Sequence, residues 1–200
     1  MLMPAIIDAH HNFWDPASRE YPWMVDDRSR LKRRYGPDDL LPELRIEDVT
    51  GSVLVQTLAS HDETADLLAL AERVAYVRGV IGWVDLAAGD VVSRIERLRA
   101  GPGGSMLVGV RHRVCDEPDP DWLRRPDVRR GLGAVAAAGL AFDLQVRTRE
   151  LPAALDVCSS MPELRFVLDH LAAPPIASGD LSAWGRALLP LAELPNVSAK

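Results

Sequence analysis

Side chains that can do chemistry gather in one short stretch near the start of the chain, where Asp8, His10 and His11 fall within four residues. They directly follow the apolar pair Ile6 and Ile7, which is the kind of run that a buried strand needs. A core strand has no use for acid and imidazole groups, so we expect the far end of this strand to open into a site. Imidazole and carboxylate groups at such a site can bind a metal ion or move a proton.

The geometry of a strand sorts these side chains onto two faces. Because successive side chains point to opposite sides, His10 and Asn12 share a face with Asp8, whereas His11 shares the other face with Phe13. We predict that the first face points into the mouth of a barrel. Asp8 is expected to orient a neighbouring histidine or backbone group there.

Strand-like and helix-like segments alternate from Gly51 onward. The β-branched run 52–57 has the length of a strand, and Ser60 with Glu63 forms the Ser-x-x-Glu capping box that opens a helix. The strand pattern returns five times, over residues 77–86, 107–114, 140–146, 165–171 and 196–200. Strands that alternate with helices form a parallel sheet covered by helices. We therefore predict one α/β domain over residues 1–200, of the (β/α)8 TIM-barrel type.

The count of strands falls short of a closed barrel. We count seven strand starts, whereas a TIM barrel has eight strands. We therefore expect a barrel truncated after the start of strand 7, without strand 8 and the last helices. Open edges beside the first and seventh strands invite pairing with another chain, so a homo-oligomer is one expectation.

The segment 14–46 is much longer than most connections and is rich in aromatic and charged side chains. We interpret it as a lid-like loop over the barrel mouth. The alternative is that Trp14 and Trp23 simply cap the core, because aromatic rings bury large areas.

Composition excludes several classes of protein. A net charge of −6 argues against a nucleic-acid partner, and no apolar run is long enough for a membrane span. Cys115 and Cys158 lie far apart without zinc-finger spacing, which favours reduced thiols in a cytoplasmic protein. The glycine-rich motifs of nucleotide-binding proteins and the Gly-x-Ser-x-Gly motif of serine hydrolases are absent from the sequence.

The stretch from Asp8 to Asp15 resembles the opening of the amidohydrolase superfamily, in particular its L-fuconolactonase-like amidohydrolase 2 branch. Four later segments resemble the fourth to seventh strands of that branch in the expected order, namely 109–112, 142–146, 168–175 and 196–200. The resemblance implies a hydrolase that opens a sugar-acid or related lactone by the attack of water on a carbonyl. It also implies a small-molecule substrate.

The same resemblance assigns roles to residues at the strand ends. The expected catalytic residues are His10, His170 and Arg111, and the first two are also the expected ligands of a divalent metal such as zinc. Arg111 is expected from its own chemistry, because the fork geometry of a guanidinium can bind a substrate carboxylate or polarise a lactone carbonyl; structural pairing with a neighbouring acid is the alternative. Asn12 stands where the family has a second metal-binding histidine, so a metal-independent reaction is the open alternative.

Four further side chains are expected to bind substrate, with Gln145 suited to its hydroxyl groups. The four are Asn12, Trp14, His112 and Gln145. Strand alternation predicts that Asp169 points away from His170 and holds a loop or a helix amino terminus instead.

The resemblance also implies a catalytic aspartate after an eighth strand, which the 200 residues do not contain. We therefore do not expect full activity from these residues alone. A non-catalytic binding chain, an incomplete barrel fragment and a decarboxylase of the same superfamily are the alternatives.

Overall fold

The computed structural model describes residues 5–25 and 30–200, and its centre is one parallel β-sheet. Each strand pairs in parallel with the next strand of the chain, so the order in the sheet is the order in the sequence. The strands are β1 (Ile7–His11), β2 (Gly51–Val55), β3 (Val77–Gly82), β4 (Leu107–His112), β5 (Ala141–Leu144), β6 (Arg165–Leu168) and β7 (Val197–Ala199).

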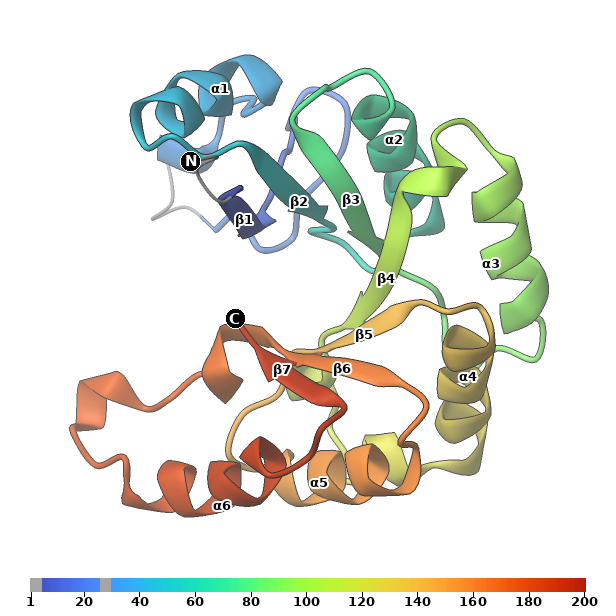
Figure 1. Cartoon of the computed structure of the whole chain (residues 1–200), viewed down its shortest axis with the longest axis vertical. Coiled ribbons are helices and arrows are strands. Elements are labelled where there is room, and N and C mark those ends of the chain that lie inside the picture. The colour runs from blue at the N-terminus through green and yellow to red at the C-terminus, as the bar shows by residue number, and fades with distance from the viewer. Residues whose placement is uncertain (1–4, 26–29) are drawn as a thin grey trace.

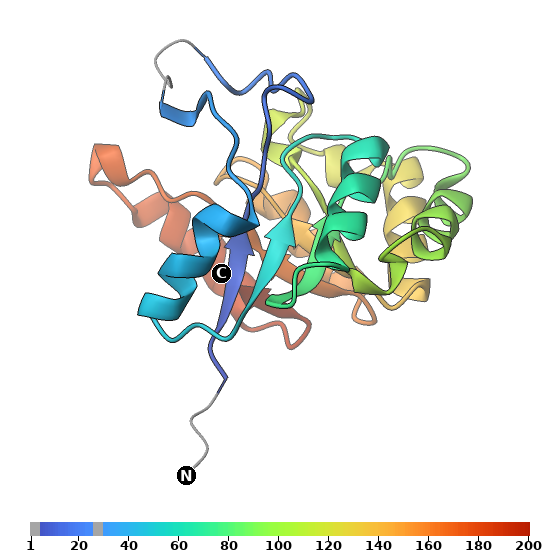
Figure 2. The ribbon, with the colours of Figure 1, turned by 90° about the horizontal axis from the view of Figure 1, so that it is seen from above.

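Helices connect the strands and lie outside the curled sheet (Figures 1 and 2). The α-helices are α1 (Pro37–Ile46), α2 (His61–Ala71), α3 (Val91–Ala100), α4 (Pro126–Ala137), α5 (Leu151–Ser160) and α6 (Ser182–Ala192). Short 3-10 turns cover Gly104–Met106, Val114–Asp116, Trp122–Arg124, Asp169–Ala172 and Ile176–Ser178. The longest described helix, α4, has 12 residues, and no described helix has the length and apolar character that a membrane crossing requires.

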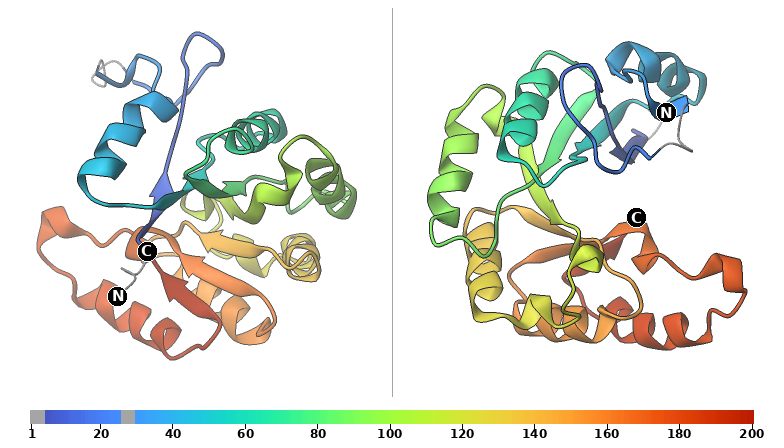
Figure 3. Two further views of the ribbon diagram at one scale, coloured as in Figure 1. Left: turned by 45° about the horizontal axis from the view of Figure 1, so that its top comes forward. Right: turned by 180° about the vertical axis from the view of Figure 1, so that it is seen from behind.

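The sheet curls into a half-barrel, which Figure 3 shows from two further sides. Lys200, just after β7, reaches across the concave face: its Nζ donates to the carbonyl of Ala9 in β1 at 3.3 Å and pairs with Asp143 of β5 at 2.6 Å. These contacts bring the two outer strands towards each other. The predicted barrel-type α/β fold with seven strands is confirmed.

A hydrophobic core fills the space between the sheet and its helices. Phe142 of β5 and Phe166 of β6 are almost completely buried, and their rings meet edge to face at 6.3 Å. Leu132 of α4 is fully buried in the same core. Burying a side chain of this size stabilises the fold by about 1.5–3 kcal/mol, so this layer holds the helices against the sheet.

One predicted helix start is confirmed, and one expected loop contains a helix. The Ser60 hydroxyl accepts a hydrogen bond from the Glu63 amide at 3.2 Å, as the capping box predicts. The segment 14–46 is not all loop, because α1 begins at Pro37. Proline suits the first helical position, and the Asp39 carboxylate accepts from the Gly36 amide at 2.8 Å.

The two ends of the remaining segment lie side by side. The backbones of Trp14 and Tyr35 exchange hydrogen bonds of 3.1 and 2.9 Å. In the left view of Figure 3 the segment after β1 rises beyond the carboxyl end of that strand. Residues 26–29 of the expected lid lie outside the described residues.

Candidate active site

A pocket of about 750 Å³ opens at the carboxyl ends of the strands. Its walls come from the ends of β1, β2, β4, β5 and β6 and from the loop after β1. The lining residues are His10, Asn12, Trp14, Trp23, Val25, Thr57, Arg111, Arg113, Gln145 and His170. The expected loop therefore contributes two tryptophans to the pocket wall, and the carboxyl ends of parallel strands are where barrel proteins place their sites.

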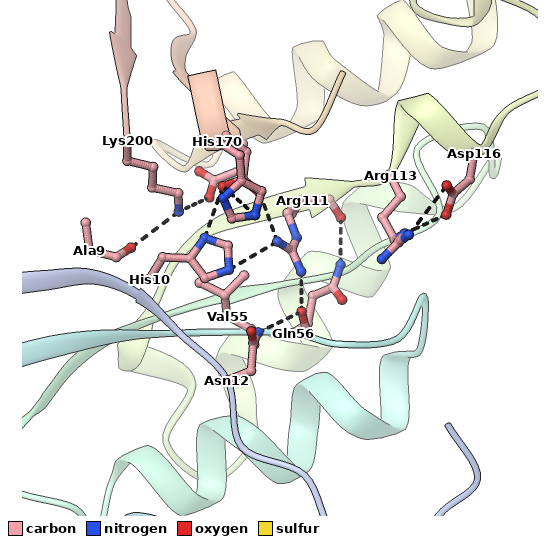
Figure 4. Close-up of polar contacts among 12 residues, drawn as sticks. Ala9, His10, Asn12, Val55, Gln56, Arg111, Arg113, Asp116, His170 and Lys200 are labelled. Atoms are coloured by element: carbon pink, nitrogen blue, oxygen red, sulfur yellow. Dashed lines mark hydrogen bonds and ion pairs between the residues drawn. The ribbon is translucent and has the colours of Figure 1, made fainter. Parts of the chain in front are cut away.

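His10, Arg111 and His170 lie close together in Figure 4, and the buried carboxylate of Asp169 joins them at the floor of this pocket. It contacts His10 Nδ1 at 3.0 Å and accepts a hydrogen bond from Arg111 Nη1 at 2.8 Å. Burial alone would raise the pKa of Asp169, but the hydrogen bonds and charges of His10 and Arg111 outweigh burial and hold that pKa well below its usual value. Asp169 is therefore an anion throughout the physiological pH range.

The two expected catalytic histidines lie face to face. The ring centroids of His10 and His170 are 4.8 Å apart, with an angle of 29° between the ring planes. With the Nδ1 proton of His10 donated to Asp169, its Nε2 is an acceptor, 3.4 Å from Arg111 Nη1. Burial lowers the pKa of His170, so this half-exposed ring is neutral at pH 7 and open to a ligand.

A left-handed turn brings His170 over the pocket. Four consecutive residues, 170–173, have positive φ angles of 52°, 50°, 59° and 46°, and none of them is glycine. The turn is tied down where Leu171 donates its amide to the Lys200 carbonyl at 3.2 Å and accepts at its own carbonyl from Trp184 Nε1 at 2.8 Å. Such backbone costs about 1–3 kcal/mol per residue and is typical of functional sites.

This turn also explains an error in the sequence prediction. Alternation along β6 predicted that Asp169 points away from His170, but both side chains lie at the site, with His170 Nε2 3.7 Å from Asp169 Oδ1. Arg165 and Val167 line the concave side of the sheet, so alternation places Asp169 on that inner side as well. The residue that departs from alternation is His170, where the left-handed backbone begins.

Arg111 is held from two sides and is only 5% exposed. Its Nη1 binds Asp169, and its Nη2 donates to the Gln56 carbonyl at 2.5 Å. The Gln56 side chain in turn donates to the Arg111 carbonyl at 3.4 Å. Asn12 binds the same segment. Its Nδ2 donates to the carbonyl of Val55 at 2.6 Å and lies 3.4 Å from that of Gln56.

The segment after β2 is fixed by a buried carboxylate that the sequence analysis treated only as a helix cap. Glu63 accepts from the amides of Thr57 at 3.0 Å and Leu58 at 2.8 Å, and also from the Thr57 hydroxyl. Thr57 lines the pocket and directly follows Gln56. Glu63 thereby supports the carbonyl groups that hold Arg111 and Asn12.

Two of the other predicted site residues line the pocket, and a third lies outside it. Trp14 and Gln145 line the pocket, and Gln145 Oε1 is buried without a hydrogen-bond partner among the described residues. His112 does not line it: Nε2 lies 2.7 Å from Glu117, and Nδ1 accepts from Trp83 at 3.3 Å. This geometry favours a structural role for His112 over the substrate contact that the sequence suggested. Asp8 accepts from the His10 amide at 3.0 Å, as predicted.

The donor set at the pocket floor fits a divalent metal. Ligand atoms of His10, Asp169 and His170 all lie within 4.8 Å of one another. Two imidazoles and one carboxylate are a donor set that zinc accepts in catalytic sites. Asn12 adds no imidazole, and its amide nitrogen is committed to backbone carbonyls. The metal ligands available among the described residues are therefore these three side chains.

Some site residues were missed by sequence reasoning, namely Gln56, Glu63, Arg113 and the inward orientation of Asp169. Arg113 had a usable signal, because it follows the end of a strand that already carries Arg111. Gln56 acts largely through its backbone carbonyl. Every residue type has this group, so the sequence gives no sign of such a role.

Together, the fold and the site define a (β/α)-barrel protein with a histidine, aspartate and arginine cluster at its strand ends. The amidohydrolase family model matches residues 7–200, and the chain belongs to that family. The predicted family is confirmed.

Lactonases are among its relatives. The chain is 41% identical over 194 residues to L-fucono-1,5-lactonase of Burkholderia ambifaria and 36% identical over 200 residues to that of Burkholderia multivorans. Each comparison covers 97% of this chain and 66% of the relative, so the chain spans slightly less than two thirds of their length. The crystal structure of an amidohydrolase from Burkholderia multivorans with bound zinc matches with a TM-score of 0.90 and 35% identity, over 98% of this chain and 69% of that one.

Proposed function

We propose that the chain belongs to a hydrolase that opens the lactone of a sugar acid by water attack on the ring carbonyl. Two relatives with 41% and 36% identity are L-fucono-1,5-lactonases, which supports this reaction and a small-molecule substrate. The observation that carries the proposal is the convergence of His10, His170 and Arg111 around one buried carboxylate at the pocket floor.

The pocket floor suits the charge that develops during such a reaction. Water attack places negative charge on the carbonyl oxygen, and fixed donors aimed at that charge are the usual source of catalysis. Arg111 supplies a cation there, and the neutral His170 ring supplies an N–H donor. Asp169 keeps Arg111 and His10 in place because it binds both of them.

Proton transfer requires a base that also returns the proton. The attacking water is expected to lose its proton to the aspartate that the resemblance implies after an eighth strand. As the ring C–O bond breaks, the same group can give that proton to the leaving oxygen, so that hydrolysis yields a hydroxy acid. His10 has a positioning role, with its Nδ1 bound to Asp169 and its Nε2 facing Arg111.

A divalent metal such as zinc would be held by His10, His170 and Asp169. When bound, such an ion polarises the carbonyl and lowers the pKa of water. The metal-independent reaction is the second candidate, and the commitment of the Asn12 amide to the Val55 carbonyl favours it.

The test measures acid release by the full-length protein from a panel of sugar-acid lactones, at constant pH with and without added zinc. We expect turnover of at least one lactone and loss of that turnover in His170→Asn. No turnover of any lactone under either condition would overturn the proposal. Release of carbon dioxide from a carboxylic acid substrate would instead support the related decarboxylase reaction.

A further inference from the structure

The pocket contains two arginines that differ in their surroundings. Arg111 is buried at the floor, where its two terminal nitrogens bind Asp169 and the Gln56 carbonyl. Arg113 lies two residues further along the chain and also lines the pocket, but its side chain is 41% exposed. In Figure 4 it stands apart from the cluster around His10. Arg113 can therefore contact a part of the substrate remote from the lactone carbonyl.

Asp116 neutralises the charge of Arg113. Arg113 Nε donates to Asp116 Oδ2 at 2.5 Å, and Nη2 lies 3.5 Å from Oδ1. The 3-10 turn Val114–Asp116 holds the two residues together, because the Asp116 amide donates to the Arg113 carbonyl at 3.0 Å. Hydrogen bonding between them raises the pKa of Arg113 and lowers that of Asp116, so both stay charged near neutral pH.

The same arrangement therefore occurs twice in the pocket. No carboxylate is among the residues that line it within the described chain, yet each arginine has one behind it, Asp169 for Arg111 and Asp116 for Arg113. Arg147 also lies near Asp116 but does not line the pocket. A compensated guanidinium still donates hydrogen bonds, but it attracts a carboxylate much less than a free one does.

We propose that Arg113 is a specificity-determining residue that donates to a substrate hydroxyl, and that Asp116 makes the pocket prefer neutral sugar-acid lactones over lactones that carry a second carboxylate. Gln145 lines the same pocket, and its side-chain amide supplies a second hydrogen-bonding group for that hydroxyl. This inference rests on the proposed lactonase function and adds the charge class of the substrate.

The experiment compares two lactones of the same ring size, an aldonic-acid lactone and an aldaric-acid monolactone whose terminal carbon is a carboxylate. The wild type is expected to have the higher kcat/KM for the neutral lactone. Asp116→Asn frees the charge of Arg113, so the ratio of kcat/KM for the anionic over the neutral lactone should rise about fivefold, the scale of a partly exposed ion pair. That gain should shrink with added salt, because exposed charges are screened.

Three variants separate this effect from a structural one. Asp121→Asn breaks a matched pair with Arg124, also three residues apart and 58% and 41% exposed, and should leave the ratio unchanged. Asp116→Glu keeps the charge and should keep the wild-type ratio. The double variant Arg113→Met with Asp116→Asn should have the same ratio of kcat/KM for the anionic over the neutral lactone as Arg113→Met alone.

Two results would overturn the inference. One is a wild type that already prefers the anionic lactone, and the other is an Asp116→Asn variant that changes both substrates by the same factor. If neither lactone nor any other is hydrolysed, the proposed function itself fails, which is a different outcome from hydrolysis without a shift in charge preference.

Discussion

The ring of His10, at the end of β1, stacks on the ring of His170, which follows β6, with 4.8 Å between their centroids. Residues so far apart in the sequence meet because parallel strands present all their carboxyl ends at one rim of the sheet. The contact depends on two further features, the left-handed turn that carries His170 and the Asp169 carboxylate that binds His10. The geometry of the histidine pair therefore depends on this turn and on Asp169 as well as on the histidines themselves.

Asp169→Asn should reduce both activity and stability. The variant keeps the shape of the side chain but leaves the charge of Arg111 buried without compensation, which typically costs about 3–5 kcal/mol. We expect the free energy of unfolding in urea to fall by roughly that amount and kcat to fall at least about 100-fold. Asp66→Asn is the matched control, because that carboxylate pairs with Arg19 at the surface and is 74% exposed. Activity within twofold of the wild type in Asp169→Asn would contradict the central role of this carboxylate.

Zinc binding should depend on His10 and His170. Replacing a residue that merely orients a ligand usually weakens metal binding about 10–100-fold, so His170→Asn and His10→Asn should each exceed that loss in isothermal titration calorimetry. His112→Asn is the control, because both of its ring nitrogens already have protein partners outside the pocket. Equal zinc affinity in all three variants would place the metal elsewhere.

The sequence predicted the fold and the histidine pair for the same physical reason. Strand-length apolar runs that end in polar residues identify the sheet and its functional rim together, so His10 and His170 followed from where their strands end. The approach of Asp169 to His170 did not follow, because the left-handed turn that begins at His170 brings that ring to the same side as Asp169 against the alternation on which the prediction relied. The amidohydrolase resemblance covered the strand ends and said nothing about Arg113 and Asp116.

Local sequence signals also gave an incomplete account of α1 and of Glu63. Helix α1 was predicted as part of a loop because the segment 14–46 is long and rich in aromatic and charged side chains, whereas Pro37 at the first helical position helps to start a helix. Glu63 was recognised as part of a capping box, but its carboxylate reaches back to Thr57 and Leu58. A helix cap and a support for the site carry the same sequence signature, and only the tertiary contacts distinguish them.

Glu63→Gln should disturb the site through the segment after β2. The amide keeps one acceptor oxygen but cannot accept from the Thr57 and Leu58 amides and the Thr57 hydroxyl together, so a buried donor is left unpaired at a cost of about 1–3 kcal/mol. We expect kcat to fall about tenfold with a smaller change in KM, since Gln56 positions Arg111 for the reaction. Asp62→Asn, an exposed neighbour in the same helical turn, should have little effect. A change confined to KM would show that Glu63 shapes binding and does not position Arg111.

His11 should make the fold sensitive to acid. The ring is 8% exposed and packs edge to face on Phe13 at 4.6 Å, and neither ring nitrogen has a hydrogen-bond partner among the described residues. Burial lowers the pKa of His11 from 6.5 to about 4, although the charge of Asp8 opposes the shift. Because the folded pKa lies below the unfolded one, the stabilisation is present above pH 6.5 and is lost as the pH falls towards about 4, and it amounts to about 3 kcal/mol. Urea unfolding at pH 7 and near pH 4 measures this loss, which His11→Phe should remove while keeping a ring against Phe13. An equal loss of stability in the variant and the wild type would assign the acid sensitivity to other groups.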